Sequence, residues 1–69
     1  MSTLTIASKA EEQQVHVRGV IDEIERRGGN YLATKRLEAG DLHGAASQLH
    51  HSGMADLGNR VESIIHDGI

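Results

Sequence analysis

Residues 37–53 read LEAGDLHGAASQLHHSG and decide how this chain folds. Gly40 is followed directly by Asp41. Glycine readily takes the left-handed conformation found at helix C-termini, and aspartate accepts hydrogen bonds from the free amides of a helix N-terminus. Gly53 then ends the helix that Asp41 begins. The stretch predicts one helix that arrives at Gly40, a second between the glycines and a third that folds back after Gly53.

The other helices follow from the same signals. Between residues 8 and 27, aliphatic residues recur at intervals of three and four, which is typical of one face of a helix. Gly28-Gly29 ends this helix and Asn30 caps the next. There is no proline and no strand-like alternation. We expect an all-α fold: a small helical bundle with one long N-terminal helix (about 8–27) followed by three short ones (about 31–39, 42–52 and 54–67).

Residues 1–7 are expected to form a flexible N-terminal arm, and residues 8–69 a single domain. Ser8 and Glu11 have the spacing of a capping box at the start of the first helix. The inward-facing positions of the short helices are predicted from helical periodicity. They are Leu32, Ala33 and Leu37 in the second helix, Leu42, Ala45, Ala46 and Leu49 in the third, and Met54, Leu57, Val61, Ile64 and Ile65 in the fourth.

The composition predicts a marginal core. With 69 residues, one aromatic side chain (Tyr31) and no cysteine, the core must consist of small aliphatic contacts without a disulfide. Such a domain favours self-association, and we expect a homodimer along the first helix. Its interface would be the aliphatic stripe Val17, Val20, Ile21 and Ile24. Gly19, on the flank of that stripe, would permit close approach of a second backbone or would be a tolerated surface glycine.

No pattern for catalysis, a cofactor or a metal ion stands out. His43 and His50 are seven residues apart, about 10 Å along a helix, while His50 and His51 are adjacent and point in different directions. Neither spacing suits a metal site on one helix. A nucleophile elbow and a phosphate loop are also missing. We therefore expect a non-enzymatic protein without cofactors, whose histidines lie at the surface or at an interface.

The residues at hand include no signal peptide and no membrane-spanning run, so the predicted location is cytoplasmic. The formal net charge is −3, yet four cations form a basic band between acidic flanks. They are Arg26, Arg27, Lys35 and Arg36. This band indicates either solvated helix ends or phosphate contacts in a dimeric helix-turn-helix-like DNA-binding regulator. The helix that would enter the DNA groove, 42–51, has no Lys or Arg, which makes DNA binding the alternative rather than the first hypothesis.

The segment from Leu32 to Leu49 resembles one tetratricopeptide-type hairpin in Leu32, the Gly40-Asp41 turn, Ala45 and Leu49. It departs from that family at Arg36, where an aromatic residue is usual, and it lacks the closing proline. Such repeats need about three units to bury a core, and this chain has one. The resemblance implies the helix pairing of protein-binding scaffolds and does not amount to a family assignment.

Tyr31 either fills the core or lies exposed beside cations. Tyr and Arg are enriched in binding hot spots, so an exposed Tyr31 with Arg26, Arg27 and Lys35 predicts a protein-binding site. Our first hypothesis is a regulator, inhibitor or adaptor that binds another protein. Short chains without an active site are often of this kind, including those of phages and other mobile elements.

Overall fold

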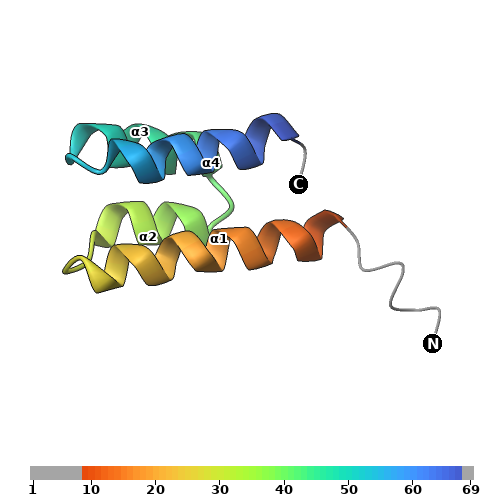
Figure 1. Cartoon of the computed structure of the whole chain (residues 1–69), viewed down its shortest axis with the longest axis horizontal. Helices are drawn as coiled ribbons and strands as arrows, with labels where there is room; N and C mark the ends of the chain where they lie inside the picture. Colours follow the sequence, from red (N-terminus) through yellow and green to blue (C-terminus); the bar gives the residue numbers. More distant parts are fainter. Residues whose placement is uncertain (1–8, 68–69) are drawn as a thin grey trace.

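The computed structural model describes residues 9–67, which form four helices: α1 (Lys9–Arg26), α2 (Tyr31–Glu38), α3 (Leu42–His51) and α4 (Ala55–Asp67). Each helix packs against the next one in the chain, and α4 returns to pack on α1. α1 and α2 form one layer and α3 and α4 form the other (Figure 1). The all-α prediction is confirmed, and every predicted helix end agrees with the structure to within one residue. The predicted arm at 1–7 and the Ser8 cap lie outside the described residues.

Side chains cap α2 and α3 at their N-termini, as predicted. The Asn30 side chain accepts a hydrogen bond from the amide of Ala33 at 3.2 Å, and the Asp41 carboxylate accepts one from the amide of Gly44 at 3.0 Å. The Gly44 amide and the Arg36 guanidinium lower the pKa of Asp41, because both stabilise its charged form. The Gly40-Asp41 pair therefore separates two helices through ordinary capping chemistry.

The ends of α2 and α3 require glycine. Gly40 and Gly53 have φ angles of 83° and 82°, in the left-handed region that other residues enter only at a cost. At Gly40 the Asp41 amide donates to the Arg36 carbonyl at 2.8 Å, and the Gly40 amide donates to the Leu37 carbonyl at 3.1 Å. These two bonds form a Schellman motif, which satisfies carbonyls left free at the helix end.

The core is entirely aliphatic, as expected from the composition. Every helix contributes to it: Val20, Ile21 and Ile24 from α1, Ala33 and Leu37 from α2, Ala45, Ala46 and Leu49 from α3, and Leu57, Val61 and Ile64 from α4. Leu42, Met54 and Ile65, which were predicted to face inward, are half-buried at its edge. Packing is most extensive between α3 and α4, where alanines and Gly58 allow the helices to approach closely.

Leu32 is exposed by 52%, and its predicted inward orientation is wrong. The buried face of α2 is set by Ala33 and Leu37, which lie four residues apart. At about 100° per residue, Leu32 points about 140° away from Leu37 and about 100° away from Ala33. A helix of only two turns has one buried stripe, and Leu32 lies outside it.

The aliphatic stripe of α1 is used within the chain. Val20, Ile21 and Ile24 are at most 5% exposed, because this chain's own helices cover them, and Val17 is half-buried. In this fold Val20, Ile21 and Ile24 are covered by the chain itself, and of the predicted dimer stripe only Val17 remains partly accessible to a second chain. Gly19 also faces a neighbour from the same chain, since a Cβ atom there would lie 3.5 Å from the Arg60 guanidinium of α4.

Candidate functional site

The first turn of α2 exposes two large apolar side chains next to each other. Tyr31 is 74% exposed and Leu32 is 52% exposed, so Tyr31 does not belong to the core. The cause is local, because the Asn30 cap fixes where α2 begins and the buried positions Ala33 and Leu37 fix how it is rotated. Tyr31 lies two residues before Ala33, about 200° around the helix, and therefore faces solvent.

Lys35 lies one turn after Tyr31 on the same side of α2. Its ammonium nitrogen is 5.8 Å from the centre of the Tyr31 ring, within the range of a cation–π contact. Tyr31, Leu32 and Lys35 are called the Tyr31 surface below. It combines an aromatic ring, an aliphatic side chain and a cation on a single helical turn, and tyrosine is one of the residue types enriched in protein-binding hot spots.

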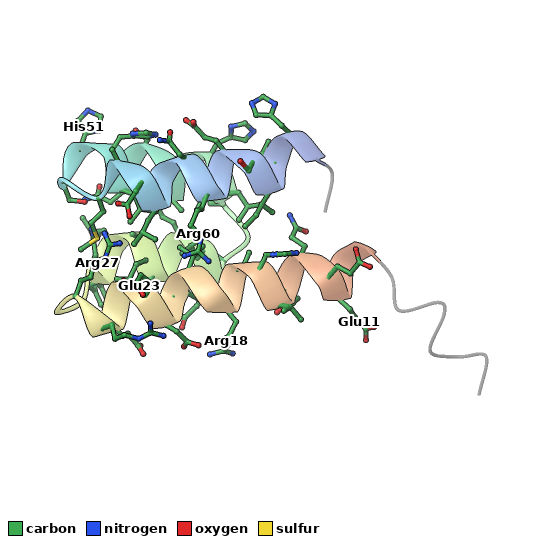
Figure 2. All side chains as sticks on the ribbon, in the orientation of Figure 1. Glu11, Arg18, Glu23, Arg27, His51 and Arg60 are labelled. Carbon is green, nitrogen blue, oxygen red and sulfur yellow. The ribbon has the colours of Figure 1, made fainter. Side chains whose placement is uncertain are left out.

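The two arginines predicted for this site are engaged elsewhere. The Arg27 guanidinium binds Asp56 at the start of α4 through two hydrogen bonds, of 2.6 and 3.0 Å, and contacts Glu23 at 3.0 Å. Arg26 is bound to Glu23 at 2.9 Å. Arg27 lies between the two layers, near Glu23 (Figure 2). Arg27 is therefore a structural link between α1 and α4.

These contacts change the pKa values of both partners. Hydrogen bonds from the Arg27 guanidinium lower the pKa of Asp56 to about 2, since they stabilise the carboxylate. The hydrogen bonds to Asp56 and Glu23 raise the pKa of Arg27 above its ordinary value. The pair stays ionised over the whole physiological range. It provides no proton-transfer group.

The structure thus brings together Tyr31 and Lys35 from the predicted site but not Arg27, and it adds Leu32. Leu32 was missed because it is apolar and was assigned to the core. Its spacing from Ala33 and Leu37 was the signal that could have identified it as exposed. The fourth member of the basic band, Arg36, is bound to Asp41 at 3.1 Å.

A groove of about 250 Å³ lies between α1 and the turn from α2 to α3. It is lined by Gln13, Gln14, Val17, Arg18, Ile21, Leu37, Glu38, Gly40 and Leu42. The groove forms because α1 has 18 residues and α2 only 8, so that α2 runs beside only part of α1. Its volume is below the 300–1,000 Å³ or so that is usual for small-molecule sites.

Two of the five histidines, His50 and His51, make contacts within the fold. The His50 ring packs against Gly58 and lies 3.3 Å from the Glu62 carboxylate, across the interface of α3 and α4. A ring nitrogen of His51 lies 2.8 Å from the Ser47 carbonyl. Within residues 9–67 no three His, Cys, Asp or Glu side chains are placed to hold a metal ion. In the same part of the chain no helix is both long and apolar enough to cross a membrane.

The chain matches no protein-family model, no curated protein and no solved structure. The resemblance of residues 32–49 to a tetratricopeptide-type hairpin therefore remains one of helix pattern. The Tyr31 surface exposes an aromatic ring, a leucine and a cation side by side on α2.

Proposed function

We propose that this chain is a small non-enzymatic protein-binding module, acting as a regulator, inhibitor or adaptor, and that the Tyr31 surface receives its partner. The exposure of Tyr31 beside Leu32 carries the proposal. Covering a tyrosine and a leucine removes apolar area from water at roughly 25 cal/mol per Å². Tyrosine also loses little conformational entropy on binding, because it has few rotatable bonds.

The ion pairs of the basic band favour a protein over DNA as the partner. Arg26, Arg27 and Arg36 are each bound to a carboxylate of this chain. Phosphate contacts need cations that are free to replace counterions along the nucleic acid. The dimeric helix-turn-helix-like DNA-binding regulator thus remains the alternative with less support. The homodimer and the cytoplasmic location also stay predictions.

The double variant Tyr31→Ala/Leu32→Ala tests the proposal. Its matched control is Val15→Ala, which removes a side chain that is 70% exposed on α1. We expect the double variant to lose partners that the wild-type chain retains in affinity capture from its native cells, while Val15→Ala keeps them. The reason is that only the double variant removes the apolar part of the Tyr31 surface.

Circular dichroism should show the same helical content and nearly the same melting temperature for all three proteins, since no core side chain is altered. Equal retention of the same partners by the double variant would contradict the proposed site. Loss of the helical signal in the double variant would show instead that these side chains support the fold.

A further inference from the structure

Lys35 differs from the other cations of the basic band. The three arginines each have a carboxylate of this chain within 3.1 Å. Within the described residues Lys35 makes no ion pair, and its ammonium group instead lies over the Tyr31 ring. Glu38, one turn further along α2, lines the groove beside α1 and makes no ion pair with Lys35. The Tyr31 surface therefore carries one positive charge that this chain does not neutralise.

We infer that the partner presents an acidic segment to the Tyr31 surface, with a carboxylate next to an apolar side chain. This inference rests on the proposed function and names the chemistry of its partner. The apolar side chain would cover the Tyr31 ring and Leu32. The carboxylate would bind the Lys35 ammonium, which already lies over the ring and needs little reordering to accept it.

The charge distribution supports an acidic protein segment over a nucleic acid. The chain has a formal net charge of −3, so a polyanion meets general repulsion, whereas a short segment with one or two carboxylates meets only the local charge of Lys35. The Tyr31 surface itself offers one cation, Lys35, which would replace about one counterion, whereas a protein that contacts about six to ten phosphates displaces several. An exposed aromatic ring and a leucine instead fit an apolar side chain.

Nuclear magnetic resonance of the full ¹⁵N-labelled chain tests this chemistry residue by residue. Three probes are compared: a ten-residue peptide of alternating Glu, Leu and Phe, the same peptide with each Glu replaced by Lys, and a 20-base-pair DNA duplex. The acidic peptide should shift the amide signals of Tyr31, Leu32 and Lys35. The variant Lys35→Ala should weaken its binding by up to about fivefold, the upper end of what one exposed charge pair contributes.

Lys35→Glu should reverse the preference, so that the basic peptide binds more tightly than the acidic one. Arg18→Ala is the matched control, because Arg18 is an exposed cation of α1 that makes no ion pair within the described residues and points away from the α3–α4 layer (Figure 2). Arg18→Ala should leave the affinity for the acidic peptide unchanged. If it weakened binding as much as Lys35→Ala, overall charge alone would attract the peptide, and the inference would be overturned.

Other results would overturn the inference in distinguishable ways. Equal or tighter binding of the basic peptide at the Tyr31 surface would reject the acidic chemistry. The same conclusion follows if no peptide binds although the double variant Tyr31→Ala/Leu32→Ala loses its partner. Both results leave the proposed function intact. If no peptide binds and the double variant also keeps its partner, both fail. Shifts caused by DNA with steep salt dependence would assign the surface to nucleic acid. Shifts of these amides with protein concentration alone would assign it to a second copy of the chain.

Discussion

Two glycines inside helices have very different surroundings. A Cβ atom added at Gly58 of α4 would lie 3.1 Å from the Ala46 carbonyl oxygen and 2.8 Å from the His50 ring. The carbonyl belongs to the backbone of α3 and cannot move without separating the helices. At Gly19 of α1 the nearest atom would be the Arg60 guanidinium at 3.5 Å, an ordinary contact with the mobile end of a side chain. Gly58 is therefore needed for helix packing, and Gly19 is not.

The two alanine substitutions should differ in their effect on the free energy of unfolding. Gly19→Ala should raise the free energy of unfolding by up to about 1 kcal/mol, the difference in helix propensity between the residues. Gly58→Ala gains the same propensity but overpacks the interface of α3 and α4, at a cost of about 1–3 kcal/mol. Urea unfolding followed by circular dichroism should therefore rank Gly19→Ala above wild type and Gly58→Ala clearly below Gly19→Ala. Equal stabilisation by both would contradict the close contact at Ala46.

Individual residues were less predictable from sequence than the elements that contain them. Sequence alone leaves the exposure of Tyr31 open, because a lone aromatic fits a core and a binding surface equally well. Leu32 was assigned to the wrong side of α2, since hydrophobicity was given more weight than its spacing from Ala33 and Leu37. The role of Arg27 depends on Asp56, 29 residues away in sequence, and no local pattern links them.

Helix boundaries, in contrast, could be predicted closely because the signals that set them are local. Asn30 and Asp41 cap the helices that follow them, and Gly40 and Gly53 end the preceding ones. These interactions span at most six residues, so they can be read without knowledge of the tertiary fold. The use of the α1 stripe could not be predicted, because one chain's helices and a second chain's helix would cover the same apolar face equally well.

The link between α1 and α4 should make stability depend on pH. In the folded chain the pKa of Asp56 is about 2, below its ordinary value of 3.8, because Arg27 binds the carboxylate. Folding therefore gains stability from this group above its ordinary pKa, and that gain is lost as the pH falls from about 4 to about 2. Because both side chains are partly exposed, the effect should be limited to a few degrees of melting temperature.

Thermal unfolding of the wild type and Asp56→Asn between pH 2 and pH 6 measures this contribution. The wild type should melt higher than the variant above pH 4, and the two should approach each other near pH 2, where about half of the Asp56 carboxyl groups are protonated even in the folded chain. Part of the acid sensitivity should persist in the variant, because the pKa of Asp41 is also lowered. A constant difference between the proteins at every pH would show that the charge of Asp56 is not what stabilises the link.

Across the whole molecule, burial is distributed unevenly along the chain. Leu49 of α3 and Leu57 and Val61 of α4 are fully buried, and their helices pack most extensively. In contrast, the N-terminal half of α1 has an exposed Val15 and a half-buried Val17, and much of it extends beyond the end of α2 (Figure 1). Local opening requires less free energy where fewer apolar contacts must be broken.

Native-state hydrogen exchange should reveal this gradient. The amides of residues 45–49 and 58–61 should exchange only through global unfolding, whereas those of residues 13–17 should exchange through local fraying and much faster. The amide of Ile24, which is buried in the same helix α1, provides the internal comparison. Equal protection from residue 13 to residue 24 would contradict the gradient and would indicate that a second chain covers the start of α1.

Two polar links between the layers lie at one end of the molecule. Arg27 binds Asp56 there, and the side-chain Nδ2 of Asn30 donates a hydrogen bond to the Ser52 hydroxyl at 2.7 Å. The first turn of α1 and the last turn of α4 lie at the opposite end (Figure 1). A stretching force applied between those two turns would separate α1 from α4 progressively, beginning at that end, and would break the Arg27–Asp56 pair last. The same force applied between the α1–α2 turn and the α3–α4 turn would act on the Arg27 and Asn30 links first. The force needed to separate the two layers should therefore depend on the end of the bundle at which it is applied.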